Sequence, residues 1–188
     1  MNKNKALFLD RDGVINQDIA YLYKPEEFVW IPGIVALMQR FQTAGYKLII
    51  VTNQSGIGRG YYSETDFHAL SYWMKTTLAK SNVNIDAIYY CPHHPTEGKG
   101  PYLKECECRK PSPGMLTTAI NEHNIDPEQS VLIGDSWRDI EAAIAAQVKR
   151  SYYFTSRLEE QKRQYILQRN GAIVATSQLS TIKPDNEC

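Results

Sequence analysis

The sequence predicts an α/β fold, a Rossmann-like parallel sheet with helices on both faces. Two observations support this fold class. Short apolar, β-branched runs alternate with longer segments of helical periodicity, which is the order of repeated β–α–β units. Several of these runs end at a threonine or an aspartate, and parallel strands bring such endings to one edge of the sheet. The length of 188 residues fits a single domain over residues 1–188.

The first half of the chain contains three predicted strands and two predicted helices. Gly45 ends the first helix, and Ser63 is a suitable N-cap for the second. In order along the chain, we expect a strand at 6–9, a helix at 34–41, a strand at 47–51, a helix at 64–80 and a strand at 85–90.

The second half repeats this alternation. Ser112 is the predicted cap of a helix that has Pro113 at its first position and runs to about residue 122. The remaining elements that we expect are a strand at 130–133, a helix that ends near 146, a strand at 151–154, a helix at 157–169 and a strand at 172–174.

The composition excludes several functional classes. The chain has 21 basic and 21 acidic residues, so it lacks the basic excess typical of proteins that bind nucleic acid. Its longest strongly apolar run, residues 48–51, is too short to span a bilayer. The N-terminal residues lack the pattern of a signal peptide. We therefore expect a cytoplasmic protein that is a monomer and has no nucleic-acid or membrane partner.

Two carboxylates follow the first predicted strand, in the segment Asp10-Arg11-Asp12-Gly13. Asp10 could attack a phosphorus atom, while Asp12 could protonate the leaving oxygen and later activate water. Such an attack needs a divalent cation, Mg²⁺, to offset the charge of the phosphate. Gly13 permits a tight turn. The alternative interpretation of this segment is an ordinary surface turn.

Three further groups follow at predicted element boundaries. Thr52 and the loop after it offer a hydroxyl and backbone N–H groups, Lys110 precedes a helix, and Asp135 and Asp139 follow a strand. Each has a structural alternative, namely a polar loop, a solvated basic pair, and a helix cap by Ser136. Their common order, each at the boundary of an element, favours one site for phosphoryl transfer.

This order of motifs resembles the haloacid dehalogenase (HAD) superfamily of phosphatases over roughly residues 5–150. By resemblance, Asp10 is the nucleophile, Asp12 the acid/base, and Thr52 and Lys110 contact the transferring phosphate. The resemblance implies that Asp10, the backbone carbonyl of Asp12 and Asp135 hold Mg²⁺, with Asp139 one layer farther out. The chain has no room for a large cap domain.

Three of the four cysteines lie between Cys91 and Cys108. With His93, the thiolates of Cys91, Cys106 and Cys108 form a set suited to a structural, tetrahedral Zn²⁺. We name residues 91–108 the zinc loop, a small insert whose polar centre cannot pack a core. His94 is an alternative ligand, and buried thiols with surface histidines are the alternative to a metal site. We expect zinc to fix the residues that follow, Arg109 and Lys110.

A closer resemblance appears in the runs at 8–16, 52–57, 89–95 and 106–111, which look like the D-glycero-D-manno-heptose 1,7-bisphosphate 7-phosphatases. That resemblance implies Mg²⁺-dependent removal of the 7-phosphate from a small phosphorylated sugar, through an aspartyl-phosphate. The heptose 1-phosphate that remains would enter nucleotide-heptose and lipopolysaccharide core biosynthesis. The related histidinol-phosphate phosphatases are the alternative. A zinc-containing binding module without catalysis is a second alternative, of a different class.

The same resemblance implies which residues contact the substrate. Arg109 would bind the distal phosphate or the sugar, since a guanidinium suits phosphate oxygens. Two positions depart from the family pattern, with Ala20 in place of glycine and Ser136 in place of lysine. Arg59 and Lys24 are further cations, which we interpret as solvated surface charge. The expected substrate-binding residues are Asp18, Ile19, Ala20, Tyr21, Thr52, Asn53, Gln54, Ser55, Arg109, Lys110 and Ser136.

Overall fold

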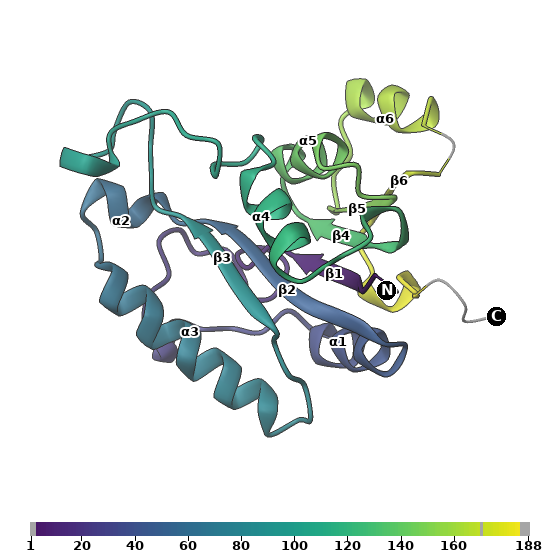
Figure 1. The fold of residues 1–188 in the computed structure, drawn as a ribbon, viewed down its shortest axis with the longest axis horizontal. Helices are drawn as coiled ribbons and strands as arrows, with labels where there is room; N and C mark the ends of the chain where they lie inside the picture. Colours follow the sequence, from purple (N-terminus) through teal and green to yellow (C-terminus); the bar gives the residue numbers. More distant parts are fainter. Residues whose placement is uncertain (1–2, 170, 185–188) are drawn as a thin grey trace.

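The computed structural model describes residues 3–169 and 171–184. Six parallel strands form one sheet in the order β3-β2-β1-β4-β5-β6 (Figure 1). The predicted Rossmann-like α/β fold is therefore confirmed. The strands are β1 (Lys5–Leu9), β2 (Tyr46–Asn53), β3 (Ala87–Cys91), β4 (Val131–Gly134), β5 (Arg150–Phe154) and β6 (Ile173–Thr176).

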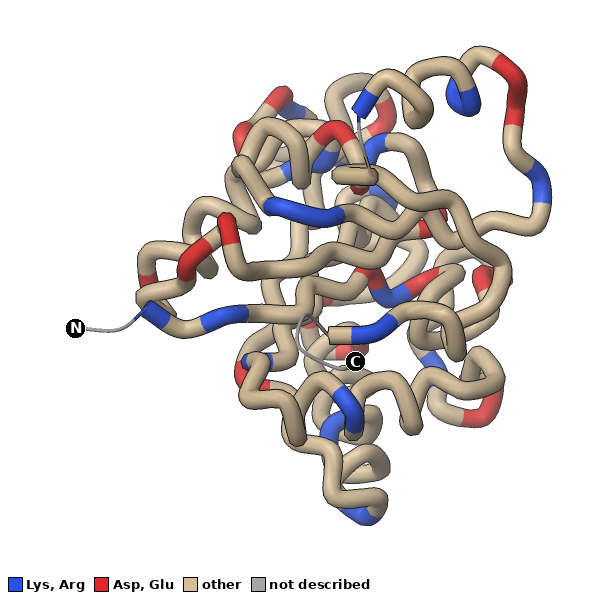
Figure 2. The backbone as a smooth tube through the Cα atoms, turned by 90° about the vertical axis from the view of Figure 1, so that its right-hand side faces the viewer, with Lys and Arg blue, Asp and Glu red and all other residues tan. Residues whose placement is uncertain are grey.

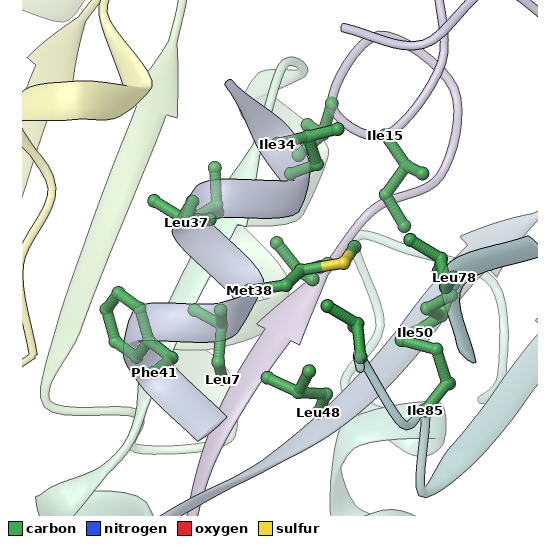
Figure 3. Packing of buried hydrophobic residues seen from close by; sticks show 14 of the residues in the cluster. Leu7, Ile15, Ile34, Leu37, Met38, Phe41, Leu48, Ile50, Leu78 and Ile85 are labelled. Carbon is green, nitrogen blue, oxygen red and sulfur yellow. The ribbon is translucent and has the colours of Figure 1, made fainter. Parts of the chain in front are cut away.

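Helices cover both faces of this sheet because the side chains of each strand alternate between the faces. Leu7, Leu48 and Ile50 pack with α1 and α3 on one face (Figure 3), while Phe8 and Val51 pack with α4 and α5 on the other. The helices are α1 (Ile34–Thr43), α2 (Ser55–Arg59), α3 (Glu64–Ala79), α4 (Gly114–Glu122), α5 (Trp137–Ala145) and α6 (Glu160–Leu167).

The strand register brings the functional segments together. Leu9 at the end of β1 lies beside Ile50 of β2 and Ile133 of β4, and all three side chains are fully buried. The residues that follow these positions are therefore carried to the same edge of the sheet. The central, fully buried strands give this edge its rigidity.

Most predicted elements are confirmed, with a few differences at their ends. Ser63 caps α3 as expected, through a hydrogen bond of 3.1 Å from the Asp66 N–H. The prediction that Ser112 caps α4 is wrong, because Pro113 holds the N-cap position and the Gly114 N–H donates to the Glu107 carbonyl instead. Thr52 lies inside β2 and not beyond it.

Two short helices also differ from expectation. The sequence did not predict α2, whose five residues include two glycines. The helix predicted at 157–169 is shorter, because Thr155 forms hydrogen bonds with the N–H and carbonyl of Arg157 and holds that residue in a turn before α6.

The connections that can cover the sheet edge are the segments 10–33 after β1 and 92–113 after β3. The second of these runs beside α2 at one end of the molecule (Figure 1). Basic and acidic positions are interspersed along the backbone (Figure 2). Within residues 3–169 and 171–184, every helix is too short or too polar to cross a membrane.

Candidate active site and metal sites

Three aspartates meet at the edge of the sheet. Asp10 follows β1, Asp135 follows β4 and Asp139 lies in the first turn of α5, and their oxygens lie within 4.8 Å of one another. This approach requires Gly13, because a Cβ at that position would lie 1.9 Å from Asp135 Oδ2. Gly13 also has a φ of +83°, which favours glycine. Three of the four predicted carboxylates thus form one cluster, and Asp12 lies outside it.

The ammonium of Lys110 is buried inside this cluster. Its Nζ lies 3.0 Å from Asp10 Oδ1 and 2.5 Å from Asp139 Oδ1, and it donates to the Val51 carbonyl at 2.7 Å. Burial alone would lower the pKa of Lys110, but the two carboxylates outweigh burial and raise it. The amide of Asn53 fixes the Lys110 backbone through bonds to its carbonyl and its N–H. The ammonium is therefore held in place and charged.

One cation does not neutralise three carboxylates. Burial, opposed in part by Lys110, raises the pKa of Asp10 to about 7, and burial together with repulsion from Asp10 raises that of Asp135 to about 8. Asp139 uses both oxygens, one on Lys110 and one on the Ser136 N–H at 2.9 Å. A hard divalent cation takes oxygen ligands and would relieve this repulsion. Asp10 and Asp135 therefore fit Mg²⁺, with Asp139 as an outer partner.

The carboxylate of Asp12 is held by protein donors. The guanidinium of Arg11, which is 1% exposed, donates to both oxygens of Asp12 and to the Leu22 carbonyl. Asn16 donates to Oδ1 and Gln54 to Oδ2, each at 2.9 Å. The position of Asp12 thus depends on side chains from two separate segments.

Thr52 and Gln54 are joined beside Asp12. Gln54 Nε2 donates to Thr52 Oγ1 at 2.9 Å, and the Tyr62 hydroxyl donates to Gln54 Oε1 at 2.5 Å. The Gln54 N–H already donates to the Cys91 carbonyl. Gly56 lies against two tyrosine rings. A Cβ at this position would come within 2.2 Å of the Tyr62 ring and 2.9 Å of the Tyr21 ring.

These groups line a cavity of about 380 Å³, in which we call the carboxylates with Lys110 the floor and the three arginines the mouth. Arg59, Arg109 and Arg138 line it together with His94, and Glu97 pairs with Arg59. Of the expected substrate residues, Ile19 does not line the cavity and is 46% exposed. Lys24 does not line it either. The predicted residues that do are Asp10, Asp12, Asp18, Ala20, Tyr21, Thr52, Asn53, Gln54, Ser55, Arg109, Lys110, Asp135, Ser136 and Asp139.

Sequence reasoning did not predict Tyr62, His94 or Arg138 as cavity residues, and it treated Arg59 as surface charge. No local motif marks Tyr62, which reaches the cavity only because α2 turns the chain back. Arg138 follows Ser136 by two residues, and Arg138 Nε lies 3.4 Å from the Ser136 hydroxyl oxygen. Its closeness in sequence to Asp135 and Asp139 was the available signal.

The zinc loop places four soft ligands in one group. The Sγ atoms of Cys91, Cys106 and Cys108 lie 3.1–3.5 Å apart, and His93 Nδ1 lies 3.3 Å from Cys108 Sγ and 3.6 Å from Cys91 Sγ. Ligands of a tetrahedral Zn²⁺ stand about 3.5–3.8 Å apart. The set therefore fits a closed, structural zinc site.

His94, the alternative ligand, lies outside this group. Its Nδ1 faces the backbone N–H of Glu97 at 3.0 Å, and its Nε2 faces Arg59 at 3.0 Å. Arg109 Nη1 donates to the His93 carbonyl at 3.0 Å. The loop that carries the cysteines therefore contacts the guanidinium at the cavity mouth directly.

Comparison with known proteins agrees with this geometry. A protein of Haemophilus influenzae named D-glycero-beta-D-manno-heptose-1,7-bisphosphate 7-phosphatase is 51% identical over 146 residues, 78% of this chain and 79% of that protein. The D-glycero-alpha-D-manno-heptose-1,7-bisphosphate 7-phosphatase of Burkholderia mallei is 50% identical over 146 residues, 78% of this chain and 77% of that protein. The chain belongs to the heptose-1,7-bisphosphate 7-phosphatase family.

Two further matches place this family among the HAD-like hydrolases. A family model described as HAD-hydrolase-like matches residues 107–176. The crystal structure of D,D-heptose 1,7-bisphosphate phosphatase from B. bronchiseptica, with magnesium and phosphate, has a TM-score of 0.76 and 31% identity, covering 94% of each chain. The chain is thus a HAD-family phosphatase that hydrolyses a phosphate monoester. This membership excludes the alternative of a non-catalytic zinc-binding module.

Proposed function

We propose that this phosphatase hydrolyses the 7-phosphate of D-glycero-D-manno-heptose 1,7-bisphosphate and releases heptose 1-phosphate and inorganic phosphate. The observation that carries the proposal is one cavity that two different groups of charged side chains line. Carboxylates and Lys110 form its floor, and three guanidinium groups lie at its mouth. A sugar with a phosphate at each end matches both. The product would supply nucleotide-heptose for lipopolysaccharide core synthesis in the cytoplasm.

In the first step, an Asp10 oxygen attacks the phosphorus atom of the 7-phosphate. The bond between phosphorus and the C7 oxygen breaks, and Asp12 gives its proton to that oxygen as it leaves. Asp10 then carries the phosphoryl group as an aspartyl-phosphate. Asp12 comes two residues after Asp10, and three neighbouring side chains donate to its carboxylate.

In the second step, a water molecule loses its proton to Asp12 and attacks the same phosphorus atom. The bond between phosphorus and the Asp10 oxygen breaks, which restores the carboxylate and releases phosphate. Thr52 donates its hydroxyl to a phosphoryl oxygen, and Lys110 adds positive charge beside Asp10. Mg²⁺ held by Asp10, Asp135 and the Asp12 carbonyl would neutralise phosphate charge throughout.

We assign the second phosphate to the cavity mouth, with Arg109 as its main contact. Burial and the nearby Arg138 both lower the pKa of Arg109, so a bound dianion would relieve the repulsion between these groups. Zn²⁺ on Cys91, His93, Cys106 and Cys108 would fix the loop behind Arg109.

Kinetics with three substrates test this proposal. We expect kcat/KM to be highest for heptose 1,7-bisphosphate, lower for heptose 7-phosphate and lowest for histidinol phosphate. Arg109→Met should remove the preference for the bisphosphate over the monophosphate while leaving the monophosphate rate similar. Faster turnover of histidinol phosphate would overturn the substrate assignment, and an unchanged preference in the variant would overturn the role of Arg109.

We further infer that residues 1–188 form one domain with the zinc loop inserted, and that the enzyme works as a monomer. The support for one domain is that residues from Asp10 to Asp139 line one cavity at the edge of one six-stranded sheet. Light scattering after gel filtration, at the concentration used for kinetics, would test the monomer. A dimer mass at that concentration would contradict it.

A further inference from the structure

The amide of Gln54 is buried between two groups of the catalytic floor. Gln54 is 2% exposed, and its Nε2 donates to Asp12 Oδ2 and to Thr52 Oγ1, each at 2.9 Å. Both hydrogens of the amide nitrogen are thus used inside the protein. Gln54 itself therefore acts on the substrate only through these two neighbours.

The Tyr62 hydroxyl sets which way this amide points. It donates to Gln54 Oε1 at 2.5 Å, so the carbonyl end faces Tyr62 and the NH₂ end faces Asp12. A flipped amide would put Oε1 against the carboxylate of Asp12, which is repulsive. Burial raises the pKa of Tyr62 to about 12, so its hydroxyl remains a donor at neutral pH.

Packing holds the Tyr62 ring in place. It stacks on Tyr23 with the ring centroids 5.4 Å apart and 11° between the planes, and it closes against Gly56. The ring is 7% exposed. The hydroxyl at its end is therefore presented from a fixed support.

The arrangement has a consequence for each partner of Gln54. The Thr52 oxygen accepts a hydrogen bond from the amide, so its own O–H remains free to donate to a phosphoryl oxygen. The Asp12 carboxylate is held at Oδ2 by the amide while Asn16 holds Oδ1. One side chain thus orients both a phosphate donor and the group that exchanges the proton.

We propose that Tyr62 and Gln54 form a positioning pair that aims Asp12 at the leaving oxygen and Thr52 at the transferring phosphate. This inference rests on the proposed roles of Asp12 and Thr52. It predicts that the pair matters most when the leaving oxygen needs a proton. An alkoxide such as that of the sugar needs one, whereas p-nitrophenolate is stable without it.

The test compares kcat/KM for an alkyl and an aryl phosphate. This constant reports the steps up to and including departure of the leaving group, and not the later hydrolysis of the aspartyl-phosphate. We expect Tyr62→Phe to lower kcat/KM for heptose 1,7-bisphosphate by about 10-fold and for p-nitrophenyl phosphate by less than about 3-fold, within the range of general-acid effects. Gln54→Met, which removes both donors at similar length, should give a larger difference in the same direction. Asp12→Asn sets the upper limit of that difference.

Tyr23→Phe is the matched control, because it deletes the corresponding hydroxyl of Tyr23, whose ring is stacked on that of Tyr62. We expect it to leave both substrates within about 2-fold of wild type, and thermal melting should show all variants folded. No loss for Tyr62→Phe and Gln54→Met on either substrate would overturn the pair, and equal losses on both substrates would overturn its action on Asp12.

The proposed function can fail independently of this inference. If wild type does not turn over heptose 1,7-bisphosphate, the substrate assignment fails. The comparison of leaving groups then continues with any alkyl phosphate that the enzyme hydrolyses. If Asp10→Asn retains activity, the nucleophile assignment fails, whichever substrate is used.

Discussion

The floor of the cavity and the zinc loop position charged side chains by different means. Asp10 and Asp135 follow strands whose last apolar side chains, Leu9 and Ile133, are fully buried. In the zinc loop only Cys91 and Pro92 are buried, and the short helix within it has no buried residue. Apolar packing can therefore fix the floor, whereas the loop needs its four soft ligands.

This difference predicts that the floor keeps its structure when a catalytic side chain is replaced. The zinc loop, in contrast, should lose its structure and its effect on activity together when the metal is removed. The two regions meet at Arg109 and Lys110, which directly follow Cys108 in the chain. Variants and metal removal can separate their contributions.

The largest effect should come from Asp10→Asn, which keeps the size of the side chain and removes the nucleophile. We expect kcat to fall by at least about 10³-fold. The melting temperature should not fall, because a buried carboxylate with a raised pKa is replaced by a neutral amide. Asp86→Asn is the control, since that aspartate pairs with Lys47 away from the cavity and should keep full activity. Substantial turnover by Asp10→Asn would contradict the nucleophile assignment.

Zinc removal should have the next largest effect. After treatment with a strong chelator and restoration of Mg²⁺, we expect kcat/KM to fall by about 10–100-fold and residues 94–105 to become sensitive to protease. Cys108→Ser should behave in the same way without a chelator. Metal analysis before and after treatment measures the zinc. Full activity and full protection from protease in the zinc-free protein would show that the loop keeps its structure without metal.

The third test concerns the carboxylates of the metal-free floor. Folding raises the pKa of Asp10 to about 7 and of Asp135 to about 8, so between about pH 4 and pH 8 the folded state binds protons that the unfolded chain has lost. The stability of the metal-free protein should therefore fall as pH rises through this window. Mg²⁺ should raise the melting temperature by about 5 °C more near pH 8 than near pH 6. An equal Mg²⁺ effect at both pH values would contradict this electrostatic account.

The smallest effect belongs to a position outside both regions. Ser63→Ala removes the cap of α3 and should lower the free energy of unfolding by about 1 kcal/mol, measured by urea denaturation. We expect kcat/KM to stay at the wild-type value, because α3 contributes no group to the catalytic floor. Reduced activity at unchanged substrate affinity would show that α3 is coupled to the cavity.

The sequence predicted the floor well because each of its groups lies close in sequence to the boundary of a strand or a helix. Asp10, Lys110 and Asp135 could be found from local order alone, and the cysteine spacing marked the zinc loop. Arg138 had a signal in its closeness to Asp135 and Asp139, whereas Tyr62 was missed because its relation to the floor depends on how separate segments meet in space. The side-chain role of Gln54 was missed for the same reason. The predicted Ser112 cap is wrong because the carbonyl of Glu107, in the zinc loop, takes the first N–H of α4.

Gly56 has a practical consequence for engineering this enzyme toward other sugars. Any side chain there would collide with Tyr62 and Tyr21, both of which line the cavity. A mutant library should therefore keep this glycine constant and diversify Arg138, which is exposed beside the cavity. New selectivity would then be sought at the rim, while the reactive centre keeps its architecture.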